Sequence, residues 1–269
     1  MLGKIFKFIL KGFAAIIAVI VVLIAAAVIS MKANPPGTIL DVQLAEQVQT
    51  AGGNLSYLVI GGRKNTGLEV IKVLRNRGER VTAVIRPSSN TPEKTQHLLD
   101  LGVDIVEGDA TVEADMNRVF NAGNYLAVVS TIGCFSCDPP ADFVGNKTIA
   151  DAAKAAGVGR ILQVSSIGAG NSLNTAPWLS RTALKDILPL KTQAENYLRD
   201  SGLDYTIIRP GGLKNGTANG HGYLSENVEA FGFIDRGDLA RLIVAALDDK
   251  RAIGKTLHAA DETRTWIFQ

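Results

Sequence analysis

The chain has 269 residues, a length that accommodates one α/β core together with an appended segment. The formal net charge is only +2 and the basic residues are scattered, which excludes the concentrated basic surface of a nucleic-acid-binding protein. Two cysteines cannot form a tetrahedral zinc site alone, and none of the three histidines lies at ligand spacing, so no metal site is apparent. We therefore expect neither a nucleic-acid partner nor a bound metal.

The N-terminal segment is apolar along its whole length. No charged side chain occurs from Gly12 to Met31, and twenty residues in a helix span about 30 Å, the thickness of a bilayer core. This pattern predicts a single-pass membrane anchor over residues 1–33. A cleaved signal peptide is the alternative, but the run is longer than a usual signal core and no A-x-A site directly follows it.

A linker over residues 34–54 follows the predicted anchor. Two prolines and a glycine open it and interrupt the helix. From Thr38 to Gln49 the apolar residues Leu40, Leu44 and Val48 recur every four positions. This spacing is typical of a short amphipathic helix, which would lie on the membrane surface or pack on the domain.

A strand–turn–helix–strand pattern begins the next segment. An apolar strand from Leu58 to Ile60 precedes a glycine-containing turn, an amphipathic helix that stops at Gly78, and a second strand from Val81 to Ile85. Such a turn places free backbone N–H groups at a helix N-terminus, where a pyrophosphate binds. A plain glycine-rich loop without a ligand is the alternative. The predicted cofactor-binding residues of the turn are Gly61, Gly62, Arg63, Lys64, Asn65, Thr66 and Gly67.

The turn departs from the dinucleotide fingerprint at one position. Gly61 and Gly67 match the first and third glycines, but Lys64 stands where the middle glycine lets the backbone approach the phosphates. The lysine adds both a Cβ atom and a cation, so it would either crowd the ligand or hold it.

The end of the second strand indicates which dinucleotide binds. NAD-preferring sites carry Asp or Glu there, but this chain has Arg86, followed by Pro87 and two serines, with no carboxylate until Glu93. Arg86, with Arg63 or Lys64, supplies cations for a 2′-phosphate. The sequence therefore predicts that NADP(H) is preferred over NAD(H), whereas a solvated strand-end arginine is the alternative.

Two observations conflict on the side of the membrane at which the domain would lie. Three lysines precede the apolar run and one follows it closely, a bias that places the domain outside the cytoplasm. NADP(H) pools are cytosolic, however, and no twin-arginine signal is present to export a folded, cofactor-loaded domain. We favour a membrane-anchored domain that faces the cytoplasm.

Strands and helices continue to alternate to the end of the chain. This alternation predicts a Rossmann-type doubly wound parallel sheet, an α/β fold, over residues 55–269. Asp109 follows the strand from Asp104 to Val106, where it would either meet the adenine or cap the next helix. The glycine- and asparagine-rich segment from Gly212 to Phe233 would lie over the site as a substrate loop.

Several motifs recur in the order of a known family. They are the GGRKNTG turn, Val106 to Asp109, Val129 to Gly133, Gln163 to Gly168 and Tyr205 to Gly211. As a set they resemble the NAD(P)H-binding, NmrA-like group of atypical short-chain dehydrogenases/reductases, which includes flavin and biliverdin reductases. The resemblance covers about residues 55–260. It implies a Rossmann fold and an NADP(H) site to which Ser130, Thr131 and Pro210 also contribute.

The resemblance also identifies candidate catalytic residues. Standard members of the superfamily use a Ser, a Tyr and a Lys four residues after the Tyr. Ser165 or Ser166 matches the serine and Lys191 matches the lysine, which would also hold the cofactor, but Ile187 stands at the tyrosine position. Ordinary functions of these residues, a turn cap for Ser165 and a surface helix lysine for Lys191, remain the alternatives.

The missing tyrosine disfavours ordinary carbonyl reduction. Hydride transfer to a flavin, a quinone or another apolar acceptor, which takes its proton from water, needs no such tyrosine, and we expect an oxidoreductase of this kind. The alternative is a non-enzymatic NADP(H)-binding redox sensor or assembly scaffold that recruits a membrane protein partner. Cys134 and Cys137 have the C-x-x-C spacing of a redox dithiol, although Pro139 and Pro140 follow instead of a helix, so loop cysteines without a role are the expectation.

Overall fold

The computed structural model describes residues 11–24, 40–41, 55–134 and 140–263. Its strands, in chain order, are β1 (Leu40–Asp41), β2 (Ser56–Ile60), β3 (Val81–Ile85), β4 (Asp104–Glu107), β5 (Tyr125–Ser130), β6 (Arg160–Val164), β7 (Asp204–Pro210), β8 (Gly212–Lys214), β9 (Gly222–Ser225), β10 (Phe233–Asp235) and β11 (Lys255–Asp261). The helices are α2 (Asn65–Asn76), α3 (Pro92–Asp100), α4 (Glu113–Asn121), α5 (Asn146–Ala155), α6 (Trp178–Ala183), α7 (Leu188–Asp200) and α8 (Arg236–Asp248), with a π-helical turn over Ala141–Gly145.

Nine of these strands form one sheet in the order β1-β9-β11-β7-β6-β5-β2-β3-β4. All neighbouring pairs from β11 to β4 are parallel, whereas β9 is antiparallel to both β11 and β1. Strands β8 and β10 pair separately. The protein therefore has a Rossmann-like α/β fold with a mostly parallel sheet, as the alternation of strands and helices predicts.

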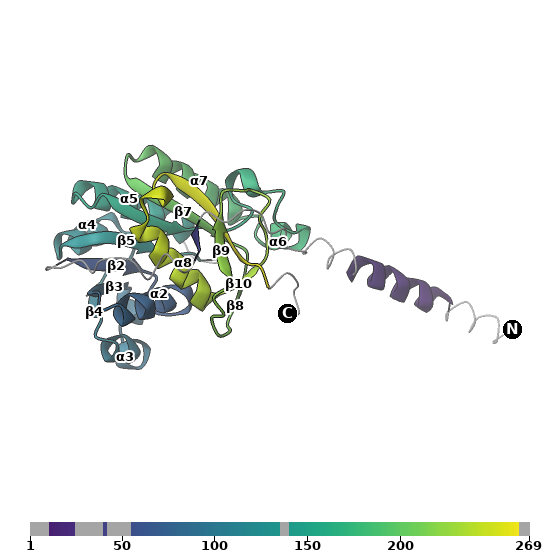
Figure 1. The fold of residues 1–269 in the computed structure, drawn as a ribbon, viewed down its shortest axis with the longest axis horizontal. Helices are drawn as coiled ribbons and strands as arrows, with labels where there is room; N and C mark the ends of the chain where they lie inside the picture. Colours follow the sequence, from purple (N-terminus) through teal and green to yellow (C-terminus); the bar gives the residue numbers. More distant parts are fainter. Residues whose placement is uncertain (1–10, 25–39, 42–54, 135–139, 264–269) are drawn as a thin grey trace.

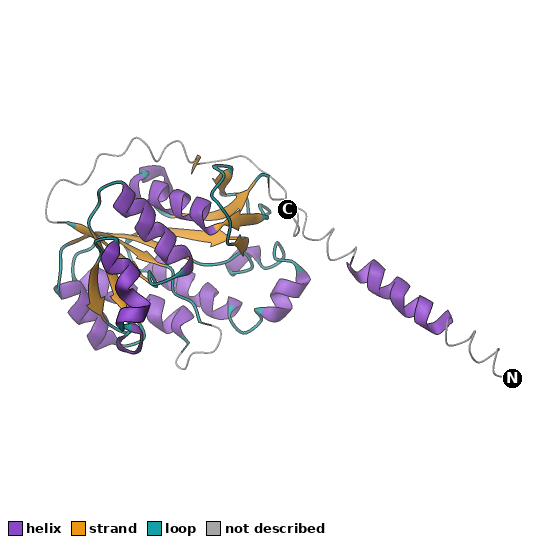
Figure 2. Cartoon of the chain, turned by 90° about the horizontal axis from the view of Figure 1, so that it is seen from below, coloured by secondary structure: helices purple, strands orange, loops and turns teal. Residues whose placement is uncertain are grey.

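Helices cover both faces of the sheet (Figures 1 and 2). Side chains of α2, α3 and α8 pack into one apolar cluster, and side chains of α4, α5 and α7 pack into another on the opposite face. Burial on both faces explains why β2 and β3 are buried at every position, since a parallel sheet between two helix layers has no solvent side.

The order of the strands creates a crevice between β2 and β5. The chain leaves β2 towards β3 and β4 on one side, then returns past β2 to form β5 on the other. Ligands of open α/β sheets bind outside the carboxyl ends of the strands at such a switch point. The turn that begins at Gly61 and the segment that begins at Thr131 both start at this point.

The structure contradicts the prediction of an N-terminal membrane anchor. A helix covers residues 11–24, and its large apolar side chains, such as Phe13 and Val22, are exposed. Among the residues that the structure describes, no helix is both long and apolar enough to cross a membrane. Residues 25–31 of the predicted span lie outside the described part of the chain.

The linker prediction also needs correction. Leu40 and Asp41, which we expected in an amphipathic helix, form strand β1, and they pair with Leu224 and Tyr223 of β9. The rest of the predicted linker helix lies outside the described residues. The segment from Gly212 to Phe233, expected to be a loop, contains two short strands, β8 and β9.

Candidate functional site

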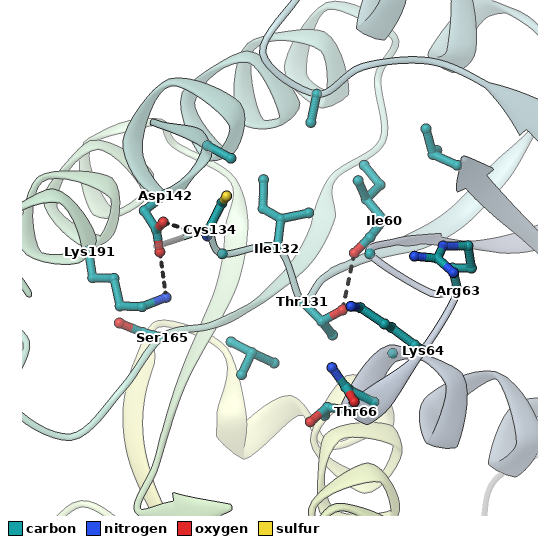
Figure 3. A pocket seen from close by; sticks show the side chains of 18 of the residues that line it. Ile60, Arg63, Lys64, Thr66, Thr131, Ile132, Cys134, Asp142, Ser165 and Lys191 are labelled. Atoms are coloured by element: carbon teal, nitrogen blue, oxygen red, sulfur yellow. Dashed lines mark hydrogen bonds and ion pairs between the residues drawn. The ribbon is translucent and has the colours of Figure 1, made fainter. Parts of the chain in front are cut away.

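A cavity of about 590 Å³ lies at the carboxyl ends of the central strands, where β2 and β5 diverge. Its volume falls within the range of small-molecule and cofactor sites. The glycine turn lines one part of the wall, and the segments that follow β3 to β7, with the π-helical turn and the start of α7, contribute to the rest (Figure 3). Of the expected site residues, those that line it are Gly61, Arg63, Lys64, Asn65, Thr66, Gly67, Arg86, Asp109, Thr131, Ser165, Ser166, Lys191 and Pro210.

Glycine is required at two positions of the turn for steric reasons. Gly61 has φ +89°, and a Cβ atom there would lie 2.7 Å from Oγ1 of Thr131. A Cβ atom on Gly67 would overlap the carbonyl oxygen of Gly61. The strand end and the start of α2 therefore approach each other more closely than any other residue type permits, and this leaves a concave cradle of backbone.

Lys64 needs no glycine-like conformation. It has φ −152°, which is extended backbone that any residue adopts, and the left-handed position of the turn is instead taken by Asn65 at φ +55°. Helix α2 begins directly after Lys64, so the first N–H groups of the helix have no intrahelical acceptor. No acidic residue occupies the first helical turn, and the positive end of the helix dipole therefore faces the cavity without competition.

Cations surround the part of the cavity next to β3. Arg86, Arg63 and Lys64 line it, and Arg86 is the first residue after the strand. The hydroxyl that lines the cavity here belongs to Ser89, at the end of the 3₁₀ turn Pro87–Ser89. This arrangement presents positive charge and a hydroxyl where NAD-binding sites present a carboxylate.

Asp109 lines the same cavity but its side chain is engaged locally. One carboxylate oxygen, Oδ1, accepts hydrogen bonds from the backbone N–H of Thr111 at 2.9 Å and from the Thr111 hydroxyl at 2.7 Å. The backbone N–H of Asp109 donates to Asp115 at 2.9 Å. The side chain of Asp109 therefore stabilises the turn before α4, and it also borders the cavity.

Two expected cofactor residues lie outside the cavity wall. Ser130 is buried and donates its hydroxyl hydrogen bond to Oδ1 of Asn146 at 2.7 Å. A Cβ atom on Gly62 would lie 2.6 Å from Cδ1 of Ile71, so this glycine allows helix α2 to pack closely on the strand. Both residues lie behind the residues that line the cavity, and their contact with the cofactor stays a prediction.

Ser165 begins a buried polar network that the sequence did not reveal. Its hydroxyl donates to Oε1 of Glu195 at 2.6 Å, and Glu195 accepts two further hydrogen bonds from Nε and Nη2 of Arg209, at 2.9 and 2.6 Å. Burial raises the pKa of Glu195, but the hydrogen bonds and positive charge of Arg209, together with Ser165 and Arg199, outweigh it and hold the pKa below its ordinary value. Glu195 is therefore a carboxylate, and the proton of Ser165 is committed to it.

Lys191 lies opposite a second buried carboxylate. Nζ of Lys191 is 2.9 Å from Oδ1 of Asp142, and Asp142 is fully buried whereas the lysine side chain is 15% exposed (Figure 3). The other oxygen of Asp142 accepts a hydrogen bond from the backbone N–H of Cys134 at 2.8 Å. Asp142 therefore holds the ammonium group at the cavity wall. Sequence reasoning missed Asp142 because it lies on the π-helical turn, 49 positions before its partner.

The part of the cavity next to Lys191 is largely apolar. Ile187, which replaces the expected tyrosine, lines it together with Leu184 and Leu213. Cys134 also lines the cavity and is in a disulfide. This bond differs from the expectation of a cysteine without a role. The other cysteine, Cys137, lies outside the described residues. Within the described part of the chain, no group of histidine, cysteine or acidic side chains is placed to hold a metal ion.

Comparisons with known proteins agree with this geometry. Residues 61–250 match a family described as NAD(P)H-binding. An uncharacterized chloroplastic protein of Arabidopsis thaliana is 34% identical over 212 residues, which cover 75% of this chain and 75% of that protein. Sanguinarine reductase of Eschscholzia californica is 38% identical over 112 residues, 40% of each chain. The solved structure of an anaerobillin reductase from Escherichia coli O157:H7 superposes with a TM-score of 0.69 and 28% identity, covering 77% of this chain and 97% of that one.

Proposed function

The chain belongs to the NAD(P)H-binding family and has a reductase-type fold, and from this premise we propose that it is an NADP(H)-dependent reductase of an apolar acceptor. The observation that carries the proposal is the composition of one cavity. A glycine cradle and cations line it at one side, and an ammonium group among apolar side chains lines it at the other.

The residues around the cavity fit an NADP(H) molecule. The N–H groups between Gly61 and Gly67 would hold the diphosphate, because the close approach of these two glycines leaves a concave cradle of backbone there. Arg86 would bind the 2′-phosphate, which distinguishes NADPH from NADH. Thr131, Pro210 and Lys191 would hold the nicotinamide riboside. When bound, NADPH supplies a hydride.

The chain's own side chains restrict the acceptor. Because the hydroxyl hydrogen of Ser165 is bonded to Glu195, Ser165 offers only lone pairs to a ligand and cannot donate to a carbonyl oxygen. Ile187 has no proton to give. The ammonium group of Lys191, which pairs with Asp142, would stabilise negative charge that develops on the acceptor. These properties suit an acceptor that delocalises the incoming electrons and takes its proton from water, such as a flavin or a quinone.

Two of the similar proteins are reductases by name, which supports a reductase over other functions of the fold. The apolar side chains of Leu184, Ile187 and Leu213 provide a surface for an apolar ring system.

Turnover with purified full-length protein tests the proposal. NADPH oxidation, followed by absorbance, should accelerate in the presence of a flavin or a quinone. The Lys191→Ala variant should lose about 10- to 100-fold in rate, the equivalent of one charged hydrogen bond. Lys185→Ala, an exposed lysine six residues earlier, is the matched control and should leave the rate unchanged. Tight NADPH binding without turnover on a broad acceptor panel would overturn the assignment as an enzyme.

A second function is favoured by the replacement of the catalytic tyrosine with Ile187. In this case the protein binds NADP(H) and reports the redox state to a protein partner without turning the cofactor over. A partner would then co-purify in a ratio that differs between NADPH and NADP, and Lys191→Ala would have little effect on that ratio.

A further inference from the structure

A second cavity of about 230 Å³ lies on the side of the sheet where β7 and β11 pair, and it shares no lining residue with the first. Arg209 of β7 and His258 of β11 are partners in the register of the two strands, and both line it. Asn171 borders it from the 3₁₀ turn Gly170–Ser172. At the rim Nζ of Lys255 is 2.6 Å from Oε1 of Glu226, with both side chains nearly half exposed.

His258 lines this cavity and has an unsatisfied hydrogen-bond acceptor. The side chain is buried, and Nδ1 lies 2.8 Å from the carbonyl oxygen of Ala230, so Nδ1 carries the hydrogen. Burial lowers the pKa of His258, the charge of Arg209 lowers it further, and together these outweigh the opposing effects of Ala230 and Glu195, so that the ring is neutral at pH 7. Its Nε2 is therefore a lone-pair acceptor, and it has no partner among the described residues.

Hydrogen-bond donors and positive charge surround this acceptor. Glu195 accepts from both Arg209 and Arg199, so one carboxylate faces two guanidinium groups and the cluster keeps one net positive charge. Nη1 of Arg209 donates one hydrogen bond to Oδ1 of Asn171 at 2.6 Å and retains a second N–H. A buried polar group without a partner is costly, and the space here is several times the roughly 30 Å³ that one water occupies in the liquid.

We propose that this cavity binds a small oxyanion that also carries an O–H group, of which inorganic phosphate at neutral pH is the simplest. The charged oxygens accept hydrogen bonds from Arg209 and from Lys255, and the O–H donates to Nε2 of His258. The complementarity has two parts, because the cations select an anion and the histidine selects an anion that still holds a proton. Sulfate, which has the same shape but no proton at neutral pH, satisfies only the first part.

The proposal is tested by NMR titration of the ¹⁵N-labelled full-length protein with inorganic phosphate and, separately, with sulfate. Phosphate should shift the Nε2 resonance of His258 and bind about tenfold more tightly than sulfate, the equivalent of one hydrogen bond. The His258→Phe variant should bind the two anions equally. His221→Phe, which alters an exposed histidine, should keep the preference for phosphate.

The proposal would be overturned by a Nε2 resonance that does not respond to phosphate, or by an equal response to both anions in the unaltered protein. Both results are obtained without the His258→Phe variant, so they hold even if that variant does not fold. The first cavity also attracts phosphate groups, so the titration is repeated in the Gly67→Ala variant, where the response at His258 should persist. Because no step uses the cofactor, the result is independent of the proposed reductase activity.

Discussion

Arg86 lies at the end of β3 and lines the first cavity, where a 2′-phosphate would distinguish the two dinucleotides. Replacing it by alanine should weaken NADPH binding by about 1–3 kcal/mol, the range for a hydrogen bond to a charged group. NADH binding should barely change, because NADH has an uncharged hydroxyl instead of a phosphate at this position. Isothermal titration calorimetry with both cofactors measures the difference.

Arg80 provides the matched control for this substitution. It precedes the same strand at the opposite end and is 3.7 Å from Asp104 on the surface, so Arg80→Ala should alter neither affinity. Equal losses for NADPH and NADH in Arg86→Ala would mean that the arginine does not read the 2′-phosphate.

Glu195 is the residue whose loss should cost most stability. Arg209 lies 2.6 Å from it in the interior, and Glu195→Gln leaves that guanidinium without a counter-charge, which should lower the free energy of unfolding by about 3–5 kcal/mol at pH 7. Urea unfolding measures this change. Glu69→Gln, which removes a partly exposed ion pair with Lys72, should cost no more than about 0.5 kcal/mol.

The same carboxylate gives stability a defined pH dependence. The pKa of Glu195 is lower in the folded protein than in the unfolded chain, so the unfolded chain binds more protons as the pH falls. Its contribution is complete above the ordinary glutamate pKa of about 4.3 and is lost as the pH falls through the lower folded value. Below about pH 4.5 the stability of Glu195→Gln should therefore fall less steeply than that of the unaltered protein, and parallel curves would exclude this group as the source.

Single residues also show where sequence reasoning stops. The glycines at positions 61 and 67 could be identified because they stand in a turn between a strand and a helix, although the clash with Thr131 that requires Gly61 comes from 70 positions later. Asp142 was missed because its partner, Lys191, lies on helix α7, 49 positions later in the chain. A carboxylate such as Glu195 on the apolar face of α7 was the available signal for a buried ion network.

At the scale of elements, the connection from β2 to α2 determines whether any dinucleotide binds. Gly67→Ala places a methyl group against the Gly61 carbonyl, which should displace the first turn of α2. The binding of NADPH and of NADH should then weaken to the same extent, by at least tenfold. Fluorescence titration with both cofactors tests this. Gly159→Ala, at a glycine with open space around it, is the control and should change neither affinity. Unaltered binding in Gly67→Ala would show that the turn does not hold the diphosphate.

The parallel strands could be predicted as elements because they are short runs that alternate with helices of clear period along most of the chain. Strand β1 could not, since Leu40 begins a run of apolar residues at four-residue spacing, and Leu40 and Asp41 become a strand only through pairing with β9, more than 180 positions later in the chain. The apolar N-terminal run was similarly ambiguous, because composition alone does not determine how long a helix it forms.

For the whole molecule, cofactor binding should appear as added stability. A ligand that binds only the folded state at 100 times its Kd contributes about 2.7 kcal/mol, and for a domain of this size that corresponds to a rise in Tm of roughly 5–10 °C. Thermal unfolding monitored by circular dichroism should show this rise with NADPH. The Gly67→Ala variant should show little rise at the same concentration, and a similar rise in both proteins would indicate binding elsewhere.

Strand β1 has a consequence for how the molecule meets its neighbours. It precedes β2 in the chain but pairs at the far side of the sheet from β4, where it covers backbone groups of β9 that would otherwise be open to another strand. The N-terminal segment thus shields that border against intermolecular pairing. A chain shortened to begin after Asp41 would keep both cavities but carry a bare strand, and with it a tendency to self-associate.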